Sequence, residues 1–325
     1  MRLQRVAGNR AAVQMVARSP RRVLARDYLD DLYTYDVDGR NVKNAKAGLF
    51  SEVPIQRVYD KYGPGTERQR LALAIMSPWV PPQGKWKHVA WDDIAVDAAV
   101  RVFDTTAFNQ ASLDVCGTAA TLNVAARIDP VGYVSLVREC FERGRLKGSE
   151  FNSDLLDTPP QPGMAVVDWM LMSAMQSRAN DWYTFDGRPG GHAGTTFKQD
   201  RWELRNYAGA VETDTIDAED DSDVIPATEK VNALLSSHPT EVEVLVSVNS
   251  EVMTNPTSRA HGHNHVVALT KPATITEDPG GDATKGRVSA DLFTWGKILT
   301  WTGSVAQWQQ MVHEFIVGST RKGLL

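Results

Sequence analysis

The chain has 325 residues, a net charge of −5 and a hydrophobic content of 42 %. This composition fits a protein with a substantial core, and the acidic balance argues against nucleic-acid binding through bulk charge. No apolar run approaches the ~20 residues of a membrane span, and the N-terminal residues lack the apolar segment of a secretory signal.

The first 18 residues form a short basic segment that we interpret as a leader. Residues 2–26 carry seven arginines and no acidic residue. Residues 3–11, with the sequence LQRVAGNRA, resemble the leader of cargo proteins of extracellular contractile injection systems, which are phage-tail-like bacterial particles. The resemblance implies a partner, the inner tube or loading machinery of such a particle. A disordered basic tail and a mitochondrial transit peptide are the alternatives.

The same resemblance implies where the protein acts. It would be loaded in the bacterial cytoplasm, travel in the extracellular particle and reach the cytosol of a target cell. A leader of this kind would need no cleaved signal peptide. It says nothing about the chemistry of the rest of the chain.

The remainder divides by composition into a linker and a domain. Residues 19–84 contain several prolines and turn signals, so we interpret them as a linker with short helices, one of them at 66–76. Residues 85–325 have the pattern of a folded domain. Its predicted helices come before its predicted strands, which indicates an α+β fold with a helical half followed by a mostly antiparallel sheet.

Four helices are predicted in the first part of the domain. The first covers 114–127, is rich in alanine and has Asp114 as its capping residue. The second runs from Pro130 to Gly144, where Cys140 falls in an apolar stripe and is expected to be a core residue without a disulfide. The others cover 164–178, with buried Met and Trp residues, and 228–237. Glycine-rich residues 187–194 and the seven acids between 212 and 223 are predicted to be loops.

The last third of the chain favours strands. Residues 241–248 alternate between polar and apolar types, as a half-buried strand does. Further strands are predicted at 263–269 and 287–295, with Asp278 at the start of a long loop between them. The spacing of apolar residues at 304–317 predicts a closing helix.

The sequence around Cys116 has the features of a reactive thiol. The cysteine lies at the start of a predicted helix, where the dipole and free N–H groups stabilise a thiolate. Gly117 allows a substrate backbone to approach closely. Gln110 lies six residues upstream, from where its amide could stabilise an oxyanion together with the Cys116 backbone N–H.

His265 is the candidate base for this thiol. It begins an apolar strand, so its imidazole would lie at the edge of a core. It follows Cys116 by about 150 residues, which is the separation found in papain-like enzymes. A cysteine on an early helix and a histidine on a later strand is also the papain-like order.

Residues from about 105 to 318 resemble papain-like cysteine peptidase domains, most closely bacterial toxin peptidases of the bacteriocin-processing and effector type. The resemblance implies a toxin-like effector that cleaves a protein substrate without a cofactor. Cys116 would be the nucleophile and form a thioester, His265 the general base and Gln110 the oxyanion donor. The motifs that carry the resemblance are Cys116-Gly117-x-Ala119-Ala120, Asn123, Asp129-Pro130-x-x-Tyr133, Asp168-Trp169-Met170, His265-Val266-Val267-Ala268-Leu269 and Thr294-Trp295-Gly296.

The third catalytic residue departs from the family's pattern. The family has Asn or Asp to orient the histidine, often in Asn-Ser-Trp-Gly, whereas this chain has Phe293-Thr294-Trp295-Gly296. Phenylalanine cannot orient an imidazole. Asp291 on the returning strand is our candidate, Thr294 is a weaker option, and a Cys–His dyad is also open. Asp278 would lie at the far end of the hairpin.

The sequence is also compatible with two interpretations other than a cysteine peptidase. His261, His263 and His265 alternate along one strand and could hold zinc with His192 or Cys116 as a fourth ligand. The chain could also be a non-catalytic cargo or structural component of the particle. Within the enzyme interpretation, a thioester serves deamidases, transglutaminases and acyltransferases as well as proteases. The choice depends on the shape of the cleft and not on these motifs.

Overall fold

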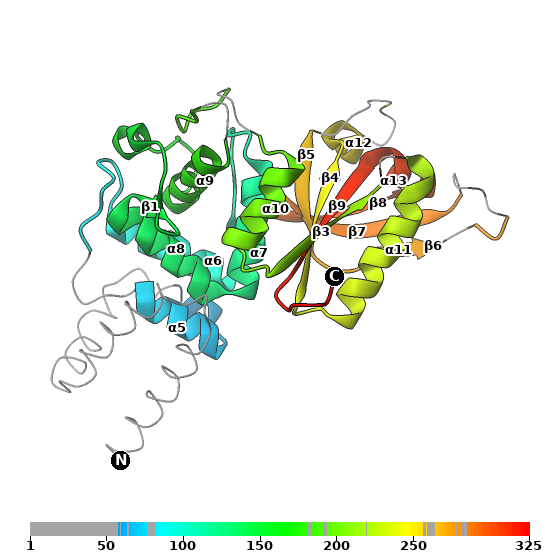
Figure 1. Ribbon diagram of the computed structural model, residues 1–325, viewed down its shortest axis with the longest axis horizontal. Helices are drawn as coiled ribbons and strands as arrows, with labels where there is room; N and C mark the ends of the chain where they lie inside the picture. Colours follow the sequence, from blue (N-terminus) through cyan, green and yellow to red (C-terminus); the bar gives the residue numbers. More distant parts are fainter. Residues whose placement is uncertain are drawn as a thin grey trace, which may run out of the picture.

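The computed structural model describes residues 58–76 (without 59 and 64), 82–180, 184–190, 194–255 (without 219), 258, 264–276 and 278–325 (without 281, 283 and 284). The leader at 1–18 and most of the segment at 19–84 lie outside the described residues. The described chain mixes helices and an antiparallel sheet. A helical half and a sheet half lie side by side, with α7 and α10 between them (Figure 1).

The helical half contains most of the helices predicted from sequence. Those expected at 66–76, 114–127, from Pro130 to Gly144 and at 164–178 are confirmed, and Gly144 ends its helix in the left-handed region at φ 61°. The sequence did not predict α6 or α10. The elements are α5 (Glu67–Met76), α6 (Trp91–Phe103), η1 (Thr105–Ala107), α7 (Cys116–Ile128), α8 (Pro130–Arg143), β1 (Arg145–Leu146), β2 (Ser149–Glu150), η2 (Ser153–Asp157), α9 (Val166–Ala179) and α10 (Phe197–Asn206).

The core of this half forms around α8 and α9. Trp169 and the three methionines of α9 are fully buried, as the sequence predicted. Cys140 of α8 is also fully buried, and both cysteines are free thiols. Arg101 of α6 forms a buried two-pronged ion pair with Asp168 of α9, at 2.5 and 2.6 Å. This pair ties the helices together and leaves neither charge unpaired in the core.

The sheet has seven strands in the order β3-β9-β4-β5-β7-β6, with β8 paired to β7, and every pairing is antiparallel. Helices α7 and α10 contact one face, and α11 and α13 the other (Figure 1). The elements are β3 (Glu212–Asp217), α11 (Asp221–Ser237), β4 (Val242–Val248), α12 (Ser250–Thr254), β5 (His265–Leu269), β6 (Thr274–Thr276), β7 (Arg287–Thr294), β8 (Lys297–Ser304), α13 (Val305–Met311) and β9 (Val312–Ser319).

The strand predicted at 241–248 exists, but it is not half-buried. All seven residues of β4 are buried, because helices cover the sheet on both faces. Leu245 packs into the core on the α7 side, whereas Val244 and Val246 pack into the core on the α11 side. Glu243 is buried too, and Arg127 of α7 forms an ion pair with it.

Two other predictions are wrong. The helix expected at 304–317 ends at Met311, and β9 then pairs with both β3 and β4. A Ser304–Gln307 capping box starts α13, but pairing in the sheet outweighs helical periodicity after Met311. The acidic run at 212–223 is not a loop either. It contains edge strand β3 and the first turn of α11, where Asp221 and Asp223 suit the positive end of the helix dipole. As a result, the predicted short helix at 228–237 begins at Asp221.

Candidate active site

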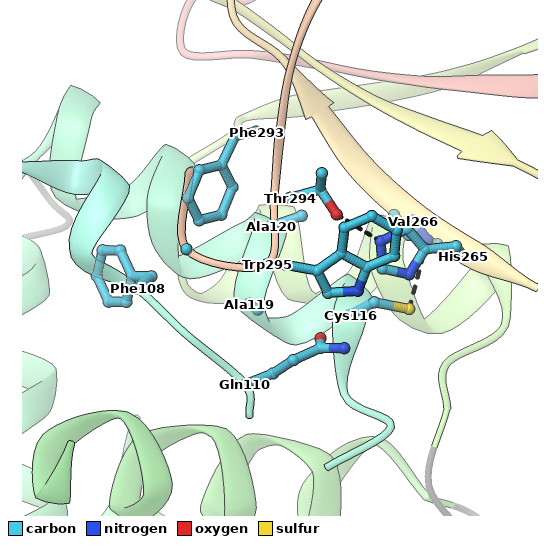
Figure 2. Close-up of a pocket in the computed structure, with 11 residues that line it drawn as sticks. Phe108, Gln110, Cys116, Ala119, Ala120, His265, Val266, Phe293, Thr294 and Trp295 are labelled. Carbon is cyan, nitrogen blue, oxygen red and sulfur yellow. Dashed lines mark hydrogen bonds between the residues drawn. The ribbon is translucent and has the colours of Figure 1, made fainter. Parts of the chain in front are cut away.

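Cys116 and His265 line one small pocket between α7 and β5. Gln110, Thr294, Trp295 and residues of α7 line the same pocket (Figure 2). Residues that are far apart in the sequence meet here because α7 packs against β5 and β7. The predicted nucleophile, base and oxyanion donor are therefore brought together.

Cys116 is the first residue of α7. Val115, not Asp114, is the N-cap, and no side chain caps the helix. The Cys116 Sγ accepts a hydrogen bond from the backbone N–H of Val266 at 3.3 Å. The thiol is thus held beside the residue that follows His265, with the first turn of the helix behind it.

The His265 imidazole is clamped on two sides. Its Nε2 lies 2.6 Å from Oγ1 of Thr294, and its ring stacks on Trp295 with centroids 4.8 Å apart and an interplanar angle of 20°. The side chain is buried, although Trp295 itself is 38 % exposed. Figure 2 shows the imidazole between the Thr294 hydroxyl and the Cys116 sulfur. Because Thr294 occupies Nε2, Nδ1 is the ring nitrogen left for the thiol.

Asp291, the predicted orienting residue, lies elsewhere. Its Oδ1 accepts a hydrogen bond from Thr300 at 2.7 Å, and its Oδ2 pairs with Lys271 at 2.8 Å. The antiparallel register explains this position, because Thr270 at the end of β5 donates its N–H to the Asp291 carbonyl. Asp291 is therefore at the opposite end of β5 from His265. Asp278 lies in the loop between β6 and β7.

Gln110 is presented by a tightly held loop. Asp168, already paired with Arg101, accepts the backbone N–H of Asn109 at 3.0 Å. The Asn109 side chain in turn accepts the N–H of Ala111, which has a positive φ of 49°. The Gln110 side chain is 8 % exposed and extends toward Cys116 (Figure 2). The buried ion pair of the helical half thus fixes the candidate oxyanion donor.

Burial dominates the electrostatics of the site. The pKa of Cys116 is raised to about 11: burial is the largest cause and the Asp200 carboxylate adds to it, while the backbone N–H groups of Val266, Gly117 and Cys116 itself oppose the shift. Burial lowers the pKa of His265 to about 4. The expectation of a thiolate stabilised by the helix N-terminus is therefore not met, since desolvation outweighs the N–H groups. At neutral pH the resting pair is a thiol and a neutral imidazole.

Gly117 has a different role from the one predicted. A Cβ at this position would collide with Oδ1 of Asp200 and Oγ1 of Thr195. The close approach that needs glycine is thus made by α10 and the loop before it, not by a substrate.

The zinc interpretation concerns residues that are mostly outside the described chain, because His261, His263 and His192 are not described. Within the described part, no group of three or more His, Cys, Asp or Glu side chains is arranged to hold a metal. His265 uses Nε2 for Thr294. Nor does any helix described here combine the length and apolarity needed to cross a membrane.

No protein-family model matches the chain, and no curated protein matches it.

The structure adds residues that sequence reasoning ranked low or missed. The signal available in the sequence for Thr294 and Trp295 was the Trp-Gly that follows Thr294, because it resembles the end of the Asn-Ser-Trp-Gly string of papain-like peptidases. Asp200 and Glu203 were missed entirely. Only the Thr196–Gln199 capping box marks the start of their helix in the sequence.

The depressed pKa of His265 gives a prediction about stability. The folded-state pKa of about 4 lies below the ordinary value of 6.5. Between these values the unfolded chain binds a proton that the folded chain does not, so stability falls as the pH drops from 6.5 toward 4. The loss should approach about 3 kcal/mol. Denaturant unfolding of His265→Gln should show a shallower pH dependence in this window.

His88→Gln, a change at an exposed position, is the control and should keep the wild-type curve. Parallel curves for the wild type and His265→Gln would contradict the prediction.

Proposed function

We propose that the domain is a papain-like cysteine peptidase with Cys116 as its nucleophile. The observation that carries the proposal is the arrangement of the thiol at the start of α7, against the Val266 N–H and beside an imidazole held by Thr294. A nucleophile, a base and a group that orients the base are the parts that covalent acyl transfer requires.

Acylation would proceed as follows. Cys116 Sγ attacks the substrate carbonyl carbon while the thiol proton moves to His265 Nδ1. The resulting oxyanion is stabilised by the Cys116 backbone N–H, which has no partner within the helix, and by the Gln110 amide. When the intermediate collapses, the C–N bond breaks, the imidazolium gives its proton to the leaving amine and a thioester remains.

Deacylation would reuse the same groups. His265 takes a proton from water as the water oxygen attacks the thioester carbonyl. The C–S bond then breaks, and the proton returns to the sulfur. Because the resting pair is neutral, proton transfer from thiol to imidazole accompanies the attack and does not precede it. The Thr294 hydroxyl supports this step by accepting the Nε2–H of the imidazolium.

We further propose that the leader addresses this enzyme to a contractile injection particle, as a toxin-like effector acting on a protein in a target cell. The support is the sequence of residues 3–11. A hydrolase delivered in this way would act only after release from the particle.

The nucleophile is tested by Cys116→Ala. This change should reduce cleavage of a peptide library, followed by mass spectrometry, by more than ~10³-fold, because no other group can form the thioester. Cys140→Ala is the matched control, since Cys140 is fully buried away from the pocket. It should keep the cleavage pattern and lose some stability. Undiminished cleavage by Cys116→Ala would refute the proposal.

The orienting group is tested by Thr294→Val, which keeps the shape of the side chain and removes the hydroxyl. Loss of the Nε2 partner should lower kcat by about tenfold, a cost of about 1.4 kcal/mol, with little change in KM. Asp291→Ala is the comparison and should leave kcat within about twofold, because its carboxylate contacts Lys271 and Thr300. An unchanged kcat in Thr294→Val together with a tenfold loss in Asp291→Ala would assign the orienting role to Asp291 instead.

The leader is tested by deleting residues 1–18. The truncated chain should unfold at the same denaturant concentration and cleave the same peptides, but it should no longer copurify with the particle. Normal loading of the truncated chain would show that these residues are not the address.

A further inference from the structure

Helix α10 carries two buried acids that the proposed mechanism does not use. Asp200 and Glu203 are one turn apart and fully buried. They face the first turns of α7, next to the candidate nucleophile, and α10 lies alongside α7 (Figure 1). A carboxyl group buried beside a thiol affects the ionisation of that thiol when it is itself ionised.

The two acids differ in their surroundings. Glu203 Oε1 accepts a hydrogen bond from the Thr118 hydroxyl at 3.0 Å, and burial raises the pKa of Glu203 well above its usual range. Neither oxygen of Asp200 has a hydrogen-bond partner of good geometry among the described residues, although the Thr195 hydroxyl lies close by. Asp200 also lies directly over Gly117, the residue after Cys116.

The charged groups around Asp200 do not neutralise it. Glu314 of β9 adds a like charge. On α10 itself, Arg201 and Arg205 bind Thr215 and Thr213 of β3. From α9, Arg178 lies over the ring of Trp202 at 5.9 Å. None of these described arginines pairs with Asp200.

The consequence is a carboxyl group that changes charge near neutral pH. Burial raises the pKa of Asp200 to about 7, Thr195 opposes this shift and the charge of Glu314 adds to it. The ionised carboxylate raises the pKa of Cys116. His265 titrates near pH 4 and stays neutral while Asp200 changes state.

We propose that Asp200 is a positioning residue that controls the ionisation of Cys116: the protonated acid leaves the thiol free to ionise, and the carboxylate suppresses the thiolate. The role rests on Cys116 being the nucleophile of the proposed function. It makes the enzyme respond to pH through a group that does not touch the substrate.

The test measures the thiol directly, by the rate at which iodoacetamide alkylates Cys116 between pH 5.5 and 9. The full chain is used, and the Cys116 peptide is quantified by mass spectrometry. In the wild type, the logarithm of the rate should rise with a slope clearly below one around pH 7, because Asp200 ionises there and opposes the thiolate. An uncoupled thiol rises with a slope of one up to its own pKa.

Asp200→Asn mimics the protonated acid and removes its titration. This variant should follow a slope of one and should alkylate about tenfold faster than the wild type at pH 8, which corresponds to about one unit of thiol pKa. At pH 5.5 the two rates should agree. Glu203→Gln is the matched control on the same helix and should keep the wild-type profile, because the carboxyl group that lies over Gly117 is that of Asp200, whereas Glu203 contacts the Thr118 hydroxyl.

A second variant applies if Asp200→Asn does not fold. Glu314→Gln removes the like charge, so Asp200 should ionise at lower pH and the bend in the alkylation profile should move to lower pH. A slope of one in the wild type, or an unchanged profile in Asp200→Asn, would overturn the proposal. Alkylation needs no substrate, so it tests Asp200 separately from the proposed activity. If Asp200 affects the alkylation of Cys116 but the protein cleaves no peptide, only the peptidase proposal is rejected. If the protein cleaves peptides but Asp200 does not affect the alkylation, only the role of Asp200 is rejected.

Discussion

Helix α7 begins against the first residues of β5, and the other parts of the site are arranged around this contact. The Cys116 sulfur accepts the Val266 N–H at 3.3 Å, so the start of the helix and the start of the strand are held in one position. The contact gives the Val266 N–H a hydrogen-bond acceptor, and it places the Cys116 thiol beside the His265 imidazole. A shift of α7 along the sheet would separate the thiol from the imidazole. The pocket therefore depends on the core on the α7 side of the sheet and on the core on the α11 side, which hold the helix and the strand in place.

Burial of the residues that line the pocket disfavours their charged forms. It raises the pKa of Cys116 to about 11 and lowers that of His265 to about 4, so the ion pair is disfavoured at rest. Stacking of Trp295 over His265 shields the short bond to Thr294 from water. In the proposed mechanism, the oxyanion that develops on a substrate opposite the Gln110 amide and the N-terminus of α7 would supply compensation that these buried groups lack at rest.

Support for the site comes from distant residues. Arg101 and Asp168 form a buried pair whose carboxylate also fixes the Asn109 N–H, and through that loop the position of Gln110. The pair carries a desolvation cost that each partner alone could not offset. On the opposite side, α10 presses Asp200 against Gly117. Two buried carboxyl groups thus lie behind residues that frame the pocket: Asp168 is fully paired, and Asp200 has no good hydrogen-bond partner among the described residues.

Patterns in the sequence were sufficient for the helices α7 and α8, the burial of α9 and Cys140, and the assignment of Cys116, Gln110 and His265 to one site, although Asp114 does not cap α7. Helical periodicity is a property of neighbouring residues, and the order and separation of Cys116 and His265 are visible along the chain, so both can be read from the sequence. The choice of Thr294 over Asp291 depended on the register of β5 against β7, and the strand at Val312–Ser319 depended on pairing with β3 and β4. Asp200 lies against Gly117, the residue after Cys116, only because α10 packs on α7. These features depend on contacts between distant segments and on how much water those contacts exclude, which only the tertiary structure decides.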